Sequence, residues 1–152
     1  MIGALLRYAW QGVRAQILDG LQAAGFADLR APHLDVFQHP GPEGARPSDL
    51  AARARTTKQA MNQLLRSLEE LGYVERRAPA ARGGDGRARV VHLTARGARA
   101  DAAIRATLVE IEAAWTARLG ASRFADLKAM LQQMRSEAPT GAQAEAQRGE
   151  AE

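Results

Sequence analysis

Apolar residues recur along the first part of the chain with the spacing of an α-helix. The positions are separated by three or four residues and are Leu6, Trp10, Val13, Ile17 and Leu21. Such spacing places them on one helical face, and Gly25 is suited to end the helix in a left-handed conformation. We therefore predict a helix over residues 2–24. A shorter helix is predicted from Pro32 through Phe37, because proline is favoured in a first helical turn.

A helix, a tight turn and a second helix are predicted between residues 46 and 71. Pro47 is placed to start the first helix, and Asp49 falls in its positively polarised first turn. Thr57 is placed to cap the second helix, which Gly72 ends. The apolar stripe of this second helix consists of Met61, Leu64, Leu65 and Leu68.

Two extended segments, 73–77 and 88–94, flank a glycine-rich stretch. The sequence GGDGRARVV (83–91) is compatible with a phosphate-binding loop, a disordered arginine–glycine tail or the tip of a β-hairpin. A P-loop needs a lysine and a hydroxyl residue after the glycines, and a dinucleotide fingerprint needs a helix there. Neither follows, and ordered segments lie on both sides. We therefore predict a hairpin whose connecting loop, 78–86, is mobile at its tip.

Two further helices complete the pattern. Thr94 is placed to cap a long helix over 95–119, whose apolar stripe is Ile104, Leu108, Ile111, Trp115 and Leu119. A last helix is predicted over 122–137, and residues 138–152 lack apolar periodicity and are expected to form a disordered tail. The predicted fold class is therefore mainly α with a small β-hairpin.

Composition excludes several classes of protein. The chain has 152 residues and no cysteine, which rules out disulfides, thiolate zinc sites and cysteine nucleophiles. Its four serines and three histidines form no nucleophile motif, and no group of His, Asp and Glu has chelating spacing. We expect no catalytic site, metal or cofactor. Charged residues interrupt every apolar run, so a cytoplasmic protein without a membrane span or secretory signal is expected.

Positive charge is concentrated in the middle of the chain. Residues 46–99 contain twelve Lys and Arg against five acids, a net charge of +7, whereas the whole chain carries +4 and the remainder therefore −3. A basic centre between acidic flanks is typical of a protein with a polyanionic partner. A solvated basic surface without a partner is the alternative.

The second predicted helix carries polar side chains suited to DNA. Its non-apolar face consists of Thr57, Lys58, Gln59, Asn62, Gln63 and Arg66, and acids come only at its far end. Asn and Gln pair with adenine edges, Arg and Lys with guanine edges, and a helix reads the major groove with its N-terminal half. The hairpin adds Arg82, Arg87 and Arg89, which are suited to the backbone and the minor groove. An ordinary bundle helix with a polar outer face is the alternative.

These residues resemble the MarR (multiple-antibiotic-resistance regulator) family of winged helix-turn-helix transcriptional regulators. The matching motifs are PSDLA (47–51), TKQAMNQLLRSLEELGYVER (57–76), DGRARVVHLT (85–94) and LTARG (93–97). The resemblance implies that Asp85 structures the wing while Arg87 enters the minor groove. Two departures are Arg55, where glycine is common in the turn, and the sequence GGDG, where bulkier residues are usual. Arg55 would have to tolerate a left-handed backbone.

The resemblance also implies a domain organisation. A single domain over 1–137 would comprise a DNA-binding lobe at 46–95 and dimerisation helices at 1–25 and 96–137. The expected function is a homodimeric repressor that binds double-stranded DNA at a pseudo-palindromic site. The alternatives are a monomer whose terminal helices pack only on each other and a winged-helix protein–protein interaction module without specific DNA readout.

Many members of the family release DNA when a small aromatic or phenolic ligand binds. Candidate pocket residues are Arg7, Tyr8, Trp10, Arg14, His33, Phe37 and Trp115. Trp10 and Trp115 lie on the apolar stripes, where packing explains them equally well. His33 is also compatible with a helix-capping or surface role.

Overall fold

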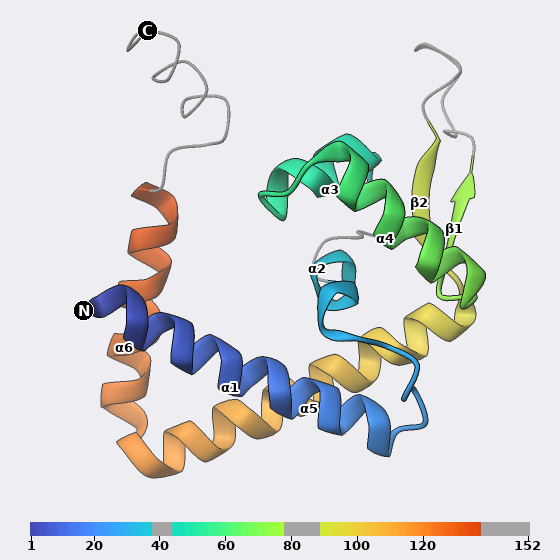
Figure 1. Cartoon of the computed structure of the whole chain (residues 1–152). Helices are drawn as coiled ribbons and strands as arrows, with labels where there is room; N and C mark the ends of the chain where they lie inside the picture. Colours follow the sequence, from blue (N-terminus) through green and yellow to red (C-terminus); the bar gives the residue numbers. More distant parts are fainter. Residues whose placement is uncertain (38–43, 78–88, 138–152) are drawn as a thin grey trace, which may run out of the picture. The chain divides into compact units, whose positions relative to one another are not determined.

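The computed structural model describes residues 1–37, 44–77 and 89–137 (Figure 1). Its elements, in chain order, are α1 (Ile2–Ala23), the 3₁₀ helix η1 (Ala31–His33), α2 (Leu34–Phe37), α3 (Pro47–Arg53), α4 (Lys58–Glu70), β1 (Val74–Arg77), β2 (Val90–Leu93), α5 (Ala95–Leu119) and α6 (Ala121–Glu137). Every predicted helix and strand is present, and the mainly-α fold class is confirmed. The predictions of a mobile hairpin tip and a disordered tail fall on residues 78–86 and 138–152, which lie outside the described residues.

The chain forms two compact units, residues 1–108 and 109–152, and the boundary falls within α5. The first unit contains α1 to β2 and the start of α5. The second contains the rest of α5 and α6. Among the described helices, none combines the length and apolar character that crossing a bilayer requires.

Local sequence signals act at the helix ends as predicted. Gly25 and Gly72 follow α1 and α4 with φ of +88° and +75°. The Thr57 hydroxyl accepts a hydrogen bond from the Ala60 amide at 3.1 Å and so caps α4. Arg55, in the turn between α3 and α4, has φ of +50°, so this non-glycine residue does adopt the left-handed conformation.

The first unit buries its core between the helices and the hairpin. Buried side chains come from all its elements and include Val13, Ile17, Leu21, Leu50, Met61, Leu65, Leu68, Tyr73 and Val91. Several predicted stripe positions are less buried than expected. Leu64 is only half-buried, and Leu6 and Trp10 are each 41% exposed, because the N-terminal half of α1 lies beyond this core.

The hairpin pairs β1 with β2 in antiparallel register, from Val74 opposite Leu93 to Arg77 opposite Val90. A third segment joins it, because Ala45 forms an isolated antiparallel bridge with Val91. Two backbone hydrogen bonds of 3.2 and 2.8 Å close this bridge. The bridge was not predicted from the sequence, and it attaches the segment before α3 to the hairpin.

The second unit packs α6 against the C-terminal part of α5. Trp115 meets Phe124 edge-to-face with ring centroids 6.1 Å apart, and Lys128 donates to Glu112 at 2.8 Å. The apolar stripes of these helices are only partly covered, since Leu119, Leu131 and Met134 are 40%, 40% and 52% exposed.

Candidate nucleic-acid interface

Helix α4 is held by its apolar face. Met61, Leu65 and Leu68 have no exposed surface, and α3 packs alongside. Burying three such side chains fixes which face of the helix remains in solvent. The opposite face is therefore presented outward by the packing of the core.

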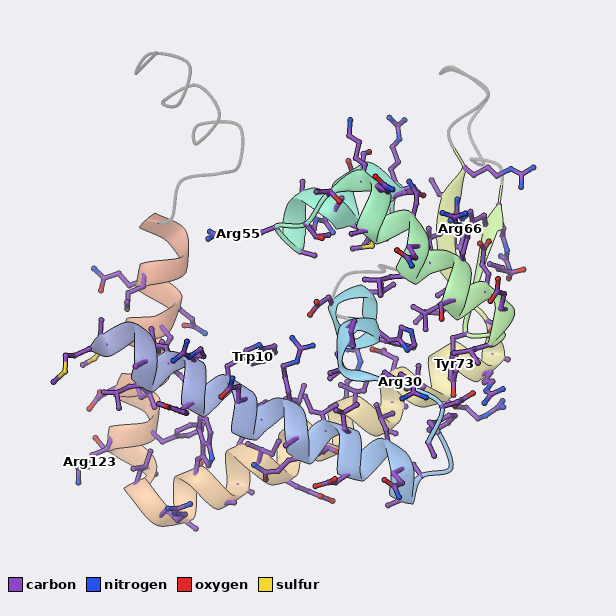
Figure 2. The ribbon with its side chains drawn as sticks, in the orientation of Figure 1. Trp10, Arg30, Arg55, Arg66, Tyr73 and Arg123 are labelled. Atoms are coloured by element: carbon purple, nitrogen blue, oxygen red, sulfur yellow. The ribbon has the colours of Figure 1, made fainter. Side chains whose placement is uncertain are left out.

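The outward face contains the residues predicted to contact DNA. Thr57, Lys58, Gln59, Gln63 and Arg66 are exposed, and Asn62 is half-buried. The exposed Arg66, labelled in Figure 2, donates weakly from Nε to the Asn62 carbonyl at 3.4 Å. The first acid in the helix is Glu69. The structure thus brings the predicted recognition residues together on one surface without a carboxylate among them.

The predicted wing residues are only partly described. Arg89 is exposed just before β2, whereas Arg82, Asp85 and Arg87 lie outside the described residues. Arg89 lines a shallow groove together with residues that the sequence analysis did not single out, namely Arg46, Ser48 and Arg76. The charge of Arg46 and Arg76 was visible in the basic segment 46–99. Their convergence was not, because it depends on how α3, α4 and the hairpin pack.

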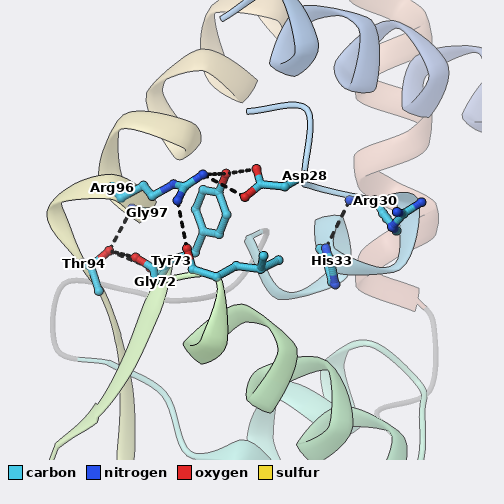
Figure 3. A network of polar contacts seen from close by, with 9 residues as sticks. Asp28, Arg30, His33, Gly72, Tyr73, Thr94, Arg96 and Gly97 are labelled. Carbon is cyan, nitrogen blue, oxygen red and sulfur yellow. Dashed lines mark hydrogen bonds and ion pairs between the residues drawn. The ribbon is translucent and has the colours of Figure 1, made fainter. Parts of the chain in front are cut away.

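A polar network fixes the base of the hairpin against α4 and α5 (Figure 3). The Asp28 carboxylate accepts hydrogen bonds from the Tyr73 hydroxyl at 2.5 Å and from Arg96 Nη2 at 2.8 Å. Arg96 also donates to the Leu71 carbonyl at the end of α4, and its guanidinium lies 4.5 Å from the Tyr73 ring centroid. Burial, followed by the hydrogen bond to Asp28, raises the pKa of Tyr73 above its ordinary value. The phenol therefore remains a hydrogen-bond donor.

Thr94, which directly follows β2, also forms hydrogen bonds at the base of the hairpin. Its hydroxyl donates to the Gly72 carbonyl at 2.6 Å and accepts from the Gly97 amide at 3.1 Å. One side chain thereby links the end of α4 to the first turn of α5 (Figure 3). The capping role predicted for Thr94 is confirmed.

His33 connects η1 with α4. Its Nδ1 accepts from the Arg30 amide at 3.1 Å, and its Nε2 lies 3.3 Å from the Ser67 hydroxyl of α4. The side chain is buried, and burial lowers the pKa of His33, with the Arg30 guanidinium acting in the same direction. The sequence left three roles open for His33, in a ligand pocket, as a helix cap or at the surface; its burial and its hydrogen bond with the Arg30 amide support the cap.

A cavity of about 390 Å³ lies in the first unit, between α1, α2 and α5. Its wall is mainly apolar and comprises Trp10, Ile17, Leu34, Phe37, Ile104 and Leu108. One ion pair, Arg105 with Asp101 at 2.8 Å, completes the lining. The volume and the aromatic wall suit a small aromatic molecule.

Two of the predicted pocket residues, Trp10 and Phe37, line this cavity. Arg14 is engaged nearby, because it donates to the Ala31 carbonyl and pairs with Asp35 at 3.4 Å. Arg7 stacks on Tyr8 on the exposed part of α1. Trp115 packs within the second unit, and His33 serves as the cap described above.

Comparison with known proteins decides the family. Residues 38–88 match the sequence profile of the MarR family. The HTH-type transcriptional repressor Rv2887 of Mycobacterium tuberculosis is 36% identical over 140 residues, which cover 90% of this chain and 89% of that protein. The chain belongs to the MarR family.

Solved structures agree with this MarR assignment. The crystal structure of the M. tuberculosis MarR family protein Rv2887 in complex with salicylic acid superimposes with a TM-score of 0.59 and 31% identity, covering 88% of this chain and 96% of that chain. The S. aureus MepR–DNA complex gives a TM-score of 0.71 at 20% identity, covering 91% and 98%, and supports the fold. In the MarR fold, α3 and α4 form the helix-turn-helix, and β1 and β2 form the wing.

Proposed function

We propose that this MarR-family chain is a cytoplasmic, homodimeric transcriptional repressor that binds double-stranded DNA. Helix α4 enters the major groove, and the hairpin lies along the sugar–phosphate backbone. The observation that carries the proposal is the outward face of α4, where Lys58, Gln59 and Gln63 are exposed and no acid occurs before Glu69. These side chains supply donors and acceptors for base edges and cations for phosphates.

The relatives support repression and DNA binding. Rv2887, which is similar over most of both chains, is named a transcriptional repressor. MepR, which shares the fold, has been crystallised with DNA. Catalysis plays no part in the proposed function, which rests on binding alone.

Exposed apolar side chains support a homodimer. In the first unit, the N-terminal part of α1 exposes Ile2 and Leu5, at 66% and 65%. In the second unit, α6 exposes Met130 and Met134, at 60% and 52%. Clustered apolar surface of this kind marks an association site. A twofold dimer presents two recognition helices about one DNA turn apart, roughly 34–36 Å.

The proposal is tested first by selecting preferred duplexes from a random DNA pool at about 150 mM salt. We expect enrichment of a pseudo-palindrome with half-sites about one helical turn apart. A pool without an enriched motif would contradict sequence-specific binding, and the protein–protein interaction module would then become the better explanation of the basic surface.

Gln63 provides a sharper test of base reading. Replacing Gln63 with Ala is expected to relax sequence preference at one position of each half-site, with a loss of about 1–3 kcal/mol at the contacted base. Competition assays with single-base operator variants measure this. A uniform loss against all duplexes, including scrambled ones, would show that Gln63 contacts the backbone instead.

We further propose that a small aromatic or phenolic ligand releases the DNA. Rv2887 has been crystallised with salicylic acid and with p-aminosalicylic acid, and the cavity walled by Trp10 and Phe37 is suited to such a molecule. Adding salicylate to the protein–operator complex is expected to lower DNA affinity, and Phe37→Ala to weaken this response. Release that is equally effective on the variant would place the ligand elsewhere.

A further inference from the structure

A basic groove runs between the start of α3, the first turns of α4 and the hairpin. The described residues that line it include Arg46, Ser48, Lys58, Asn62, Arg76 and Arg89, and none of them carries a carboxylate. Four cations thus surround a shallow groove of about 450 Å³. Like charges gathered in this way repel one another, and a bound anion would relieve that repulsion.

The cations of the groove are largely uncompensated. Within the described part of the chain, Arg46, Lys58 and Arg89 form no ion pair, and all three are exposed. By contrast, Arg14, Arg96 and Arg105, outside the groove, each pair with a carboxylate.

Arg76 is the most constrained of the four. Its Nε lies 3.2 Å from Glu69 Oε2, which anchors the side chain against the end of α4. Nevertheless, among the described residues the buried Nη2 has no hydrogen-bond partner, and the buried Nε has only its ion pair with Glu69. A buried guanidinium nitrogen without an acceptor is costly, and an incoming anionic oxygen would remove that cost. This observation points to a ligand and is independent of the net charge.

We propose that this groove binds a backbone phosphate of DNA and sets the register of α4 in the major groove. The proposal rests on the proposed function, because Lys58 and Asn62 belong both to the groove and to the outward face of α4. A DNA strand whose bases contact α4 would therefore have its backbone phosphates next to the groove. Arg76 acts from β1, where it lies opposite Val91, so the hairpin contributes to this contact through a residue of its paired strands.

The test measures duplex affinity as a function of salt between about 50 and 200 mM, using the selected operator and a scrambled duplex. Arg46→Gln and Arg89→Gln are each expected to lower the magnitude of the log–log salt slope by about 0.9 and to weaken binding to both duplexes by a similar factor. Arg123→Gln, on α6, is the matched control, since it makes the same charge change at an exposed position. Its slope should equal that of the wild type.

Arg76 is tested with two variants because it also contacts Glu69. Arg76→Gln is expected to lower the slope, whereas Arg76→Lys, which keeps the charge, should retain most of it. If Arg76→Gln does not fold, the Arg46 and Arg89 variants decide the question. If both of those folded variants have the salt slope of the wild type, the groove does not bind a DNA phosphate, and the proposal is wrong although the protein still binds DNA. A wild-type protein that binds neither duplex would instead overturn the proposed function.

Inorganic phosphate distinguishes the source of the anion. At constant ionic strength, exchanging chloride for phosphate is expected to leave operator affinity nearly unchanged, because one free phosphate lacks the other contacts of the duplex. If phosphate protects the wild type against thermal unfolding but not Arg46→Gln, and the DNA slopes are equal, the groove is a site for a free anion. That result would also overturn the proposal.

Discussion

Gly97 lies where the first turn of α5 passes the start of the hairpin, with no room beside it for a side chain. A Cβ at this position would stand 2.0 Å from the Tyr73 carbonyl oxygen and 3.1 Å from a Leu93 methyl group. The nearest atom belongs to the backbone, so it cannot rotate away. Because Gly97 has no side chain, the first turn of α5 can lie against Tyr73, and the Gly97 amide can reach the Thr94 hydroxyl. This close approach permits the polar network at the base of the hairpin (Figure 3).

Gly97→Ala is therefore expected to lower the free energy of unfolding by about 1–3 kcal/mol, because the inserted methyl group overpacks the site. Chemical denaturation at fixed protein concentration measures this. Gly12→Ala is the control: nothing lies within 4 Å of its Cβ position in α1, and alanine there should stabilise by about 0.5–1 kcal/mol. Equal stability of Gly97→Ala and the wild type would show that the hairpin base can move to make room.

The short helix η1 is the element that connects the apolar cavity with α4. Its His33 contacts Ser67 of α4, while Leu34 and Phe37 of the adjoining α2 line the cavity. The capping hydrogen bond from the Arg30 amide requires an unprotonated Nδ1. The position of η1 against α4 consequently depends on a neutral imidazole.

A pH dependence of stability follows from His33. The folded protein has a lowered pKa at His33, owing to burial and then to Arg30, with Asp28 opposing, whereas the unfolded chain takes up a proton near pH 6.5. Below that pH the unfolded state binds more protons than the folded state does. The contribution of His33 to the free energy of unfolding is therefore fully present above about pH 6.5 and declines as the pH falls towards the folded pKa. His33→Gln should remove this decline. Denaturation at about pH 5.5 and 7.5 measures it, and parallel profiles for both proteins would contradict the role of His33.

The ion pair in the cavity wall is expected to affect the affinity of the cavity for a negatively charged ligand. Arg105 is paired with Asp101, so an aromatic carboxylate meets an arginine whose charge is already partly compensated. Asp101→Asn should strengthen salicylate binding by about two- to fivefold, because exposed pairs contribute up to about 1 kcal/mol. Salicylamide, which is neutral, should bind both proteins equally. Calorimetric titration of the two ligands measures the difference, and an equal change for both would exclude a charge effect.

At the scale of the whole molecule, the exposed apolar side chains favour a homodimer. Large apolar side chains remain in solvent near both ends of the described chain, Leu5 and Tyr8 on α1 and Met130 and Met134 on α6. A monomer would keep this surface exposed at a cost in solubility. In the proposed homodimer, the exposed apolar side chains of each unit would be covered by the other copy.

Leu5→Glu and Met130→Glu are each expected to shift the protein from dimer towards monomer and to weaken operator binding at least tenfold, since one half-site contact is lost on dissociation. Gln22→Glu, at an exposed position near the end of α1, makes the same charge change and should leave the dimer intact. Sedimentation velocity measures the assembly. A wild-type protein that sediments as a monomer at micromolar concentration would contradict the dimer directly.

Features that depend on near neighbours in the chain could be predicted from the sequence. The helix bounds, the Thr57 cap and the two-stranded hairpin follow from spacing, capping chemistry and glycine placement, all of which act over a few residues. The left-handed turn at Arg55 was expected from the resemblance to the MarR family. The polar face of α4 is equally local, because a helical stripe that is buried on one side defines the other. The MarR resemblance rested on these same motifs and is confirmed.

Features that join distant segments required the folded structure. The Ala45–Val91 bridge is a single pair without periodicity, and the contacts among Asp28, Tyr73 and Arg96 link three elements far apart in the chain. The basic groove likewise needs α3, α4 and the hairpin in place before its cations meet. Sequence patterns therefore specified which face of each helix is apolar and which residues are charged, while packing of the core specified which of those charges share a surface. The physical reason is that local preferences act through the backbone, whereas side-chain convergence is set by burial of apolar groups from remote segments.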